Sequence, residues 1–510
     1  MEIVASSLAR KPGMSLRRRV LRGAASLGSA RIVVSLLNAA SIVILARILS
    51  PDDFGIIAIA MAVVSVIVAA TEAALHQALV QCREPTRDHI DTVWTMSFIR
   101  AWLIFAVIAL AAWPLSLAYG NERLVGVFLV AGVAGAFMEF YNPLLTTATR
   151  DMRFGPFAAF QIGQKAVALG LAIVLALAWG NFWGIILGNA LGAILASLAS
   201  YLIIPYRPAF NLSRMREIWG FSGWMSLNQL CETINWRFDQ LAIGFAVTKA
   251  ELGYYAVADS VAVIPSRELS FPLRNALFPG FSQIAGQPKK LRQTFLEAQS
   301  GVALLTAPAA VGLALLADPV VGLLLGTRWV EIVPVLQLLA ITYAFDTLIT
   351  VIRPLAMAMG ATKYLFLRQL TALFVRIPLI LGGLALGGLV GAAAGRALSS
   401  LVNCLISFML AKRLVSVGVW EQIRAHSLTL VCLLAMSTAV GGCQAALPLA
   451  IADRPLLQIV ALVPVGVLTY AGAVLALWHL SGRRAGPVKE LLRIVSRISG
   501  LAVSWRPRRT

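Results

Sequence analysis

The chain has 510 residues, of which 59% are apolar and only 13% charged, and its mean hydropathy is +0.82. Soluble domains carry about 45–50% apolar and about 25% charged residues, so this composition excludes an ordinary soluble protein. A net charge of +20 would suit nucleic acid. In so apolar a chain, contacts with anionic lipid headgroups explain it better, and we expect no nucleic-acid partner.

Apolar runs long enough to span a bilayer recur from one end of the chain to the other. A span needs about 20 mostly apolar residues to cross roughly 30 Å of hydrocarbon. In chain order, the 14 predicted spans lie near 27–48, 54–75, 93–115, 124–147, 157–178, 182–204, 221–246, 253–276, 300–325, 332–358, 364–386, 389–411, 425–447 and 456–480. Turn signals such as Gly180-Asn181 and Gly387-Gly388 separate neighbouring runs. The runs lack strand alternation, so we predict an all-α polytopic membrane protein with about 14 transmembrane helices.

Lys and Arg are concentrated in alternate connections and at both ends of the chain. The opposite connections hold only Arg123, Lys249, Arg328 and Arg454. Because basic residues stay on the cytoplasmic side, both termini are predicted to be cytoplasmic. No small-residue cleavage site precedes the first span, which indicates an uncleaved first helix.

Three pairs of segments repeat in a consistent order. They are Asp53–Ala60 (DFGIIAIA) with Glu251–Ala258 (ELGYYAVA), Gly184 and Gly188 with Gly391 and Gly395, and Asn142-Pro143-Leu144 with Arg353-Pro354-Leu355. A displacement of six spans preserves orientation, so the repeat predicts two parallel six-helix lobes related by an axis along the membrane normal.

The repeat and the charge pattern predict six regions. They are a basic cytoplasmic N-terminus (1–24), an N-lobe of spans 1–6 (25–204), a cytoplasmic linker (205–220), a C-lobe of spans 7–12 (221–412), accessory spans 13 and 14 (413–480), and a basic cytoplasmic tail (481–510). In the tail, apolar residues at helical spacing between Val488 and Leu501 predict an interfacial helix.

Ionisable residues are concentrated in spans 1–12, and the central parts of spans 13 and 14 hold none. Intramembrane charges are costly, so they usually face a wet cavity or a partner. The candidate substrate-binding residues are Arg31, Asn38, Arg100, Lys165, Arg237, Arg267, Arg274, Arg353, Arg376 and Arg396. The candidate ion-coupling acids are Glu232, Asp239, Asp259 and Asp346. The alternative is that these residues pair between helices and bind no ligand.

Within this set, Arg267 and Arg274 share one face of span 8, about 10 Å apart at 1.5 Å rise per residue. With Arg31, they are expected to form an anion-binding patch, because a guanidinium pairs phosphate or carboxylate in a bidentate manner. The alternative is that Arg267 pairs with Asp259 or Glu232 and that Arg274 reaches the cytoplasmic headgroups.

Signals for catalysis or a bound cofactor are lacking. The five cysteines are scattered, the four histidines form no ligand pair at helical spacing, and no HExxH or Gly-Lys sequence occurs. The sequence therefore predicts no enzyme, no metal site and no cofactor.

Several turn patterns resemble a known family. Ile44–Gly55, Leu325–Trp329 with Pro334–Ala340, and Pro354–Gly360 are similar to segments of Wzx-like polysaccharide flippases, in the multidrug/oligosaccharidyl-lipid/polysaccharide exporter superfamily. The resemblance covers roughly residues 25–415. It implies two six-helix lobes forming a V around a central cavity, and a lipid-linked glycan as cargo.

The first functional hypothesis is a flippase in the bacterial inner membrane. It would translocate undecaprenyl-pyrophosphate-linked oligosaccharide repeat units by alternating access, for exopolysaccharide, capsule or O-antigen assembly. The expected partners are the lipid-linked oligosaccharide, bilayer lipids, and the polysaccharide polymerase or export machinery. One alternative is a multidrug/cation antiporter, which favours cavity carboxylates and aromatics. The other is a glycan ligase or polymerase, for which a long extracytoplasmic loop is expected.

Overall fold

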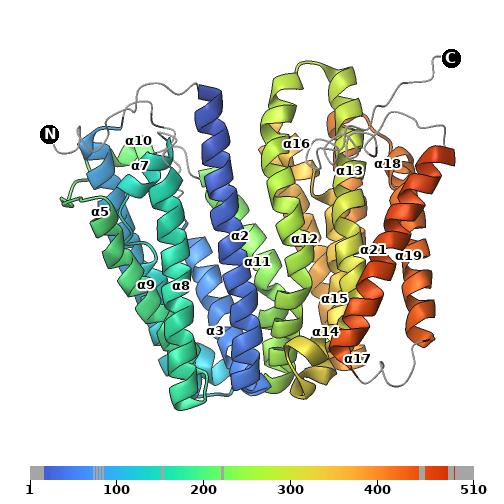
Figure 1. The fold of residues 1–510 in the computed structure, drawn as a ribbon. Coiled ribbons are helices and arrows are strands. Elements are labelled where there is room, and N and C mark those ends of the chain that lie inside the picture. Colours follow the sequence, from blue (N-terminus) through green and yellow to red (C-terminus); the bar gives the residue numbers. More distant parts are fainter. Residues whose placement is uncertain are drawn as a thin grey trace. The chain divides into compact units, whose positions relative to one another are not determined.

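The computed structural model describes residues 16–72, 85–150, 154–219, 223–446 and 454–480, with single positions 75, 79, 82 and 488. All regular structure in these residues is helical (Figure 1). The predicted all-α class is therefore confirmed. The predicted interfacial helix at 488–501 lies outside the described residues, apart from Val488.

The chain divides into two compact units whose boundaries fall inside helices. Unit 1 comprises Met1–Leu49 and Ala60–Leu230, and unit 2 comprises Ser50–Ile59 and Cys231–Thr510. Two helices, α3 (Pro51–Ala70) and α11 (Gly223–Ala246), therefore each contribute to both units. The lobe limits expected from the sequence, 25–204 and 221–412, stay a prediction.

Unit 1 is built on a pair of closely packed helices. Besides parts of α3 and α11, its described helices are α2 (Leu16–Ile48), α5 (Arg87–Ala118), α6 (Arg123–Phe137), α7 (Leu144–Arg150), α8 (Phe154–Trp179), α9 (Trp183–Ile203) and α10 (Met215–Trp219). Figure 1 shows α8 beside α9, with α2 packed on α8. A Cβ at Gly188 of α9 would fall against the backbone of Ala172 on α8. Glycine there lets the two backbones touch, as small residues do between membrane helices.

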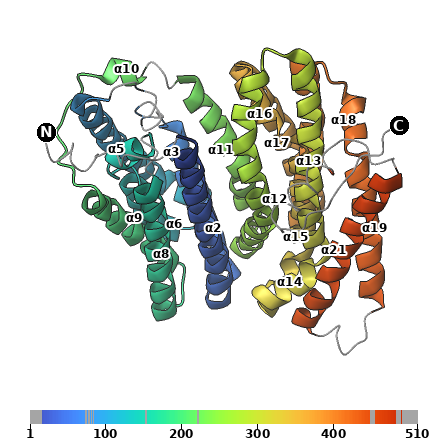
Figure 2. The ribbon, with the colours of Figure 1, turned by 45° about the horizontal axis from the view of Figure 1, so that its top comes forward.

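Unit 2 contains the remaining helices. They are α12 (Lys249–Ile284), α13 (Pro288–Leu315), α14 (Ala317–Leu324), the 3₁₀ helix η1 (Thr327–Ile332), α15 (Val333–Ile349), α16 (Ile352–Ala358), α17 (Thr362–Val415), α18 (Val419–Ala425), α19 (Ser427–Ala445) and α21 (Pro455–Leu480). α13 packs against α12 and α15. α19 and α21 lie side by side and contact α13 and α14 (Figure 2).

The long helix α17 folds back on itself at the glycine pair predicted to be a turn. Gly387 and Gly388 leave helical geometry, and Gly388 has a φ of 56°, in the left-handed region that favours glycine. A Cβ at Gly383 would fall on the carbonyl oxygen of Gly391, and the reverse also holds. The two arms are therefore in backbone contact, and the predicted turn between spans 11 and 12 is confirmed.

Three predicted spans that were expected to be continuous are interrupted. Span 124–147 divides into α6 and α7, span 300–325 into α13 and α14, and span 332–358 into α15 and α16. Pro143 directly precedes α7, while Pro319 and Pro354 lie in the first turns of α14 and α16. Proline lacks the N–H that continues a helix but fits its first turn, so each helix restarts at a proline.

Ten helices among the described residues are long and apolar enough to cross a membrane, with α17 taken as one and Thr327–Ala358 also taken as one. Large apolar side chains on their surfaces are widely exposed, including Leu110 (80%), Leu202 (84%) and Leu386 (92%). Such surfaces suit a hydrocarbon solvent. The chain is a multi-pass membrane protein, while the count of 14 crossings stays a prediction.

The first repeated segment has the same helix start in both copies. At α3, Ser50 Oγ bonds Asp53 Oδ2 at 2.6 Å, and at α12, Thr248 Oγ1 bonds Glu251 Oε2 at 2.8 Å. In each pair, the backbone N–H of the acidic residue donates to the hydroxyl. These are reciprocal capping boxes, which satisfy N–H groups at a helix start.

The repeated glycines of these two helix starts also meet. A Cβ at Gly55 would overlap the carbonyl oxygen of Lys249, and one at Gly253 would overlap that of Pro51. The first turns of α3 and α12 thus touch through their backbones within unit 2. Neither position has room for any side chain.

Candidate functional site

Four of the candidate site residues form one buried ionic network in unit 2. Arg376 of α17 donates to both carboxylate oxygens of Asp239 on α11, at 2.8 and 2.6 Å. Arg396, on the other arm of α17, contacts Asp239 at 2.7 Å and Asp259 of α12 at 2.9 Å. Asp239 is 0% exposed and Arg396 is 3% exposed. The two carboxylates and two guanidinium groups balance in charge, as buried ions require.

Two tyrosines complete this network, and neither was a candidate from the sequence. Tyr255 donates its hydroxyl to Asp239 at 2.8 Å, and Tyr343 donates to Asp259 at 2.7 Å. Arg396 in turn donates to both phenolic oxygens, at 3.1 and 2.8 Å. Tyr255 lies one helical turn before Asp259, a spacing that could have indicated a shared face. Nothing in the sequence pairs Tyr343 of α15 with α12.

Other candidates in unit 2 lie nearer the surface. Arg353 of α16 donates to both oxygens of Glu232 at 2.6 and 2.8 Å, with the side chains 46% and 38% exposed. Asp346 accepts a hydrogen bond from Ser400 Oγ at 2.6 Å. Arg237 donates to Gln240 Oε1 at 3.0 Å. The Glu232–Arg353 pair is thus exposed, unlike the buried network.

The two arginines of the predicted patch on α12 are both exposed. Arg267 makes no hydrogen bond or ion pair with any residue that the structure describes. The alternative pairing of Arg267 with Asp259 or Glu232 is therefore not present. The patch with Arg31 of α2 joins residues of both units, so it stays a prediction.

In unit 1, Arg100 of α5 is shared by two carboxylates. Its Nη1 contacts Glu139 and its Nη2 contacts Glu72, the latter at 3.0 Å. Lys165 on α8 is half-buried and has no hydrogen bond or ion pair within the described part of the chain. On α2, Arg31 is half-buried and Asn38 is exposed. The structure thus assembles Arg100 into a cluster but leaves Lys165 apart from it.

Two of the three interruptions, those before α7 and α16, lie at positions that the sequence repeat pairs. The break before α7 contains Asn142, whose N–H donates to Ser200 Oγ at 2.9 Å and whose side-chain amide donates to Ile204 O at 2.6 Å. The break before α16 lies next to Arg353. At membrane depth, irregular backbone is tolerated where it is buried in protein or lines a wet cavity, and paired interruptions mark transporter binding regions.

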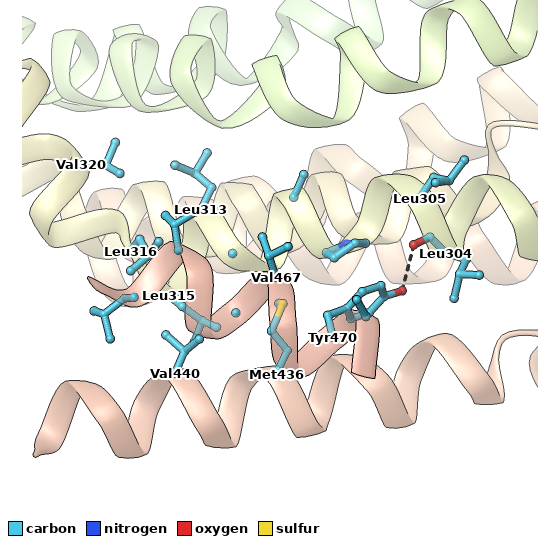
Figure 3. Close-up of a pocket in the computed structure, with 17 residues that line it drawn as sticks. Leu304, Leu305, Leu313, Leu315, Leu316, Val320, Met436, Val440, Val467 and Tyr470 are labelled. Carbon is cyan, nitrogen blue, oxygen red and sulfur yellow. Dashed lines mark hydrogen bonds between the residues drawn. The ribbon is translucent and has the colours of Figure 1, made fainter. Parts of the chain in front are cut away.

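A cavity of about 490 Å³ in unit 2 has a different chemistry (Figure 3). Leu313 of α13, Met436 of α19 and Val467 of α21 line it, and its other lining residues are apolar except for Tyr470. The Tyr470 hydroxyl already donates to Leu304 O at 2.9 Å, as the dashed line shows. The cavity therefore offers nothing to a charged ligand.

The segment after α9 is tied to the start of α5. Tyr206 donates to Asp91, Asn211 N–H donates to Thr95 Oγ1 at 3.0 Å, and His89 Nε2 bonds Glu217 at 2.9 Å. The hydrogen bond from His89, followed by that from Arg214, holds the pKa of Glu217 below its usual range. The linker expected at 205–220 is therefore fixed to unit 1 along much of its length.

The Glu217 contact gives a pH-dependent prediction. A carboxyl with a lowered folded pKa contributes stability above its ordinary pKa and loses it as pH falls through the folded value. Glu217→Gln should therefore lower the thermal stability of the detergent-solubilised protein at neutral pH. The difference from wild type should begin to shrink at about pH 4, near the ordinary pKa of Glu, and should vanish only below the lowered folded pKa. Glu122→Gln, at an exposed acid, is the control; equal pH profiles for both variants would contradict the prediction.

Comparison with known proteins identifies the family. A family model described as polysaccharide biosynthesis protein matches residues 44–334, more than half of the chain. The chain belongs to the polysaccharide biosynthesis protein family. WzxC, the lipopolysaccharide biosynthesis protein of Escherichia coli K12, is 23% identical over 78% of this chain and 81% of its own length. The succinoglycan biosynthesis transport protein ExoT of Rhizobium meliloti is 26% identical over 75% and 76%.

Solved structures share the fold of this family member. The lipid II flippase MurJ, in an inward closed conformation, matches with a TM-score of 0.73 at 14% identity, over 89% of this chain and 98% of MurJ. An inward-facing multidrug resistance MATE transporter matches with a TM-score of 0.57 at 15% identity, over 77% and 94%. The resemblance to Wzx-like flippases is confirmed, and this family member is a membrane transport protein, not an enzyme.

Proposed function

We propose that the protein flips undecaprenyl-pyrophosphate-linked oligosaccharide repeat units across the bacterial inner membrane, for assembly of a capsule, O-antigen or exopolysaccharide. The family match supports this cargo class, as do relatives named for lipopolysaccharide and succinoglycan biosynthesis. The fold shared with a lipid II flippase supports the mode of action. The polysaccharide polymerase or export machinery is the further partner that we propose.

One observation carries the choice of an anionic cargo. Arg267 lies within predicted span 8, is exposed, and has no acidic partner among the described residues. A guanidinium at membrane depth needs an anion or a wet cavity, because its unpaired burial is costly. A pyrophosphate supplies such an anion. A cationic drug does not, which disfavours the multidrug antiporter even though the MATE fold is similar.

The transport cycle follows from the same physical costs. The bilayer core rejects a pyrophosphate and sugar hydroxyls, whose unpaired polar groups each cost several kcal/mol there. A cavity lined by cations and polar groups replaces their hydration, while the prenyl tail stays in lipid. Alternating access would then carry the headgroup across. Glu232, Asp239, Asp259 and Asp346 are the acids that we propose for ion coupling.

The proposed architecture has 14 membrane crossings, both termini in the cytoplasm, and two six-helix lobes around a central V-shaped cavity. The contacts of Gly55 and Gly253, which the sequence repeat pairs, support this architecture. Gly55 lies against the first turn of α12, and Gly253 lies against the first turn of α3. A two-fold axis between repeats produces such reciprocal contacts. Residues 413–480 would lie outside the lobes, consistent with the packing of α19 and α21 on α13 and α14.

The test uses cells that lack the native gene and depend on this protein for glycan export. Arg267→Ala should cause lipid-linked glycan to accumulate on the cytoplasmic face. Arg267→Lys should also fail substantially, since lysine keeps the charge but not the planar fork. We expect a loss of tenfold or more, about 1.4 kcal/mol or greater. Normal export by both variants at normal membrane abundance would refute the role of Arg267. Absence of lipid-linked glycan flipping by the wild-type protein would refute the function.

A further inference from the structure

Arg368 of α17 carries a guanidinium group that forms no ion pair with any described residue. Its Nη1 donates to Ser407 Oγ at 3.1 Å, which is its one hydrogen bond within the described part of the chain. Nε is closed off from solvent and has no hydrogen-bond partner there. A charge that has lost its water without gaining a counter-ion is costly. Arg368 therefore has the surroundings of a cation that binds a ligand, and not those of a structural ion pair.

The arginines of the buried network show what a structural partner looks like. Arg376 donates from Nε and Nη2, one edge of its planar fork, to the two carboxylate oxygens of Asp239. The same edge of Arg368, formed by Nε and Nη2, makes no hydrogen bond with the described residues. This is the edge that binds carboxylate or phosphate in a bidentate manner. On Arg368 it has no oxyanion from the described chain to bind.

A second arginine with unused donors lies close by in unit 2. Only Nη1 of Arg353 meets Glu232, and it contacts both carboxylate oxygens, so Nε and Nη2 make no hydrogen bond with described residues. Both Arg353 and Glu232 are within electrostatic reach of Arg368. The helices are fixed here by Asn235, about one turn after Glu232, which donates to the carbonyl oxygen of Gln369 at 3.0 Å. Two guanidinium groups thus present unused donors in one region.

A neutral polar group on the other arm of α17 is also unsatisfied. Asn403 lies about one turn before Ser407, the partner of Arg368, and its Oδ1 is buried without a hydrogen bond among the described residues. The remaining carboxylate within electrostatic reach, that of Asp346, accepts a hydrogen bond from Ser400 at 2.6 Å and forms no ion pair with Arg368. A buried amide atom left without a partner is a second indication of a ligand, independent of charge.

We propose that Arg368 and Arg353 bind a phosphate group beside Asn403, and that Glu232 competes with this group as an internal anion. A single fork fills the two oxygens of a carboxylate, whereas phosphate has further oxygens for a second fork. Arg368 lies six residues after the first residue of α17, about 9 Å along the helix, at its predicted cytoplasmic end. The phosphate comes either from the cargo pyrophosphate or from a phospholipid headgroup. We assign it to the cargo as it enters; this assignment rests on the proposed function, whereas phosphate binding does not.

The first experiment measures binding to the purified chain in detergent. The probe is farnesyl pyrophosphate, and farnesol, which lacks the phosphates, is its reference. Arg368→Gln should bind the probe about tenfold more weakly or worse, through lost charge-assisted hydrogen bonds. Glu232→Gln should bind it about threefold more tightly, because an exposed competing ion pair is removed.

Lys363→Gln is the matched control for this experiment. It removes the same charge from an exposed residue in the first turn of the same helix, so its affinity should equal that of wild type. Equal affinity of wild type and Arg368→Gln, or farnesol binding as tightly as farnesyl pyrophosphate, would overturn the proposal. So would weaker binding by Glu232→Gln.

The two sources of phosphate are separated by competition. Phosphatidylglycerol, added in equimolar amount with farnesyl pyrophosphate, should leave the bound fraction of the probe unchanged. Displacement of the probe from wild type by this phospholipid would assign the site to a lipid headgroup and overturn its assignment to the cargo.

Stability without any ligand tests the structural alternative. Arg368→Gln removes a charge that has no ion-pair partner in the described chain, so the melting temperature in detergent should be equal to that of wild type or higher. Arg376→Gln should lower it, because Asp239 loses a counter-ion in a buried site. A fall as large in Arg368→Gln as in Arg376→Gln, or failure of Arg368→Gln to fold, would show that Arg368 is a structural ion.

The last experiment asks whether transport uses the site. In the export assay, Arg368→Gln should lose about tenfold or more at normal membrane abundance, while Lys363→Gln exports normally. Wild-type export by an Arg368→Gln chain that no longer binds the probe would overturn the assignment to the cargo. If the wild-type protein flips no lipid-linked glycan, the proposed function fails, while binding of farnesyl pyrophosphate still decides whether Arg368 and Arg353 hold a phosphate.

Discussion

Asp239→Asn should leave little folded protein in the membrane, with an expected loss of about 3–5 kcal/mol. The change keeps the shape of the side chain and an acceptor for Tyr255, but Arg376 and Arg396 lose their shared carboxylate. Asp239 is 0% exposed, so water cannot replace the lost charge. The measurement is the temperature at which the detergent-solubilised protein loses its monodisperse peak, together with its abundance in membranes.

Two further variants test whether the loss of stability in Asp239→Asn comes from the unbalanced charge. Glu232→Gln breaks an ion pair whose side chains are 38% and 46% exposed, so we expect a loss below about 1 kcal/mol. Adding Arg376→Gln to Asp239→Asn restores neutrality and should recover part of the lost stability. Wild-type stability of Asp239→Asn would show that the buried network does not form in the membrane.

Gly253→Ala should be the most damaging single-methyl substitution in α12. The new Cβ would overlap the carbonyl oxygen of Pro51, and a backbone atom cannot move aside as a flexible side chain can. Overpacking of this kind costs about 1–3 kcal/mol, and more where the backbone must shift. We expect lower thermal stability and at least a tenfold loss of function in the export assay.

Gly280→Ala is the matched control on the same helix. A Cβ at Gly280 meets nothing within 4 Å, so alanine should be neutral or stabilise α12 by up to about 1 kcal/mol through its higher helix propensity. Gly55→Ala should reproduce the loss, because its Cβ would overlap Lys249 O. If Gly253→Ala and Gly280→Ala behave alike, α3 and α12 are not in backbone contact in the membrane.

Features set by local sequence were predictable. Apolar runs placed the helices, and the glycine pair at Gly387 and Gly388 placed the fold-back of α17, because both signals depend on adjacent residues. The membrane charges stood out for the same reason, since an ionisable side chain is conspicuous in an apolar run. Asp239 and Arg396 were both found in this way.

Partner choice was not predictable, because it depends on helices that are distant in sequence. Arg376 lies 137 residues from Asp239, and Arg396 lies 141 residues from Tyr255. The break between α6 and α7 was also missed, with Pro143 its main local signal. The sequence predicted a continuous span through Glu139, so the helix break beside this residue was not foreseen. Its ion pair with Arg100, 39 residues away, was not foreseen either.

The sharing of α3 and α11 between units has a consequence for recombination. A chimera that joins this chain to a relative at the linker would take the first turns of α3 from one parent and α12 from the other. The contact between Gly55 and the α12 backbone would then combine surfaces that never evolved together. Crossovers should instead fall after Leu49, Ile59 and Leu230, so that Ser50–Ile59 is inherited together with the C-terminal part. Exchange of whole sequence halves is therefore expected to yield fewer folded hybrids than exchange along these structural boundaries.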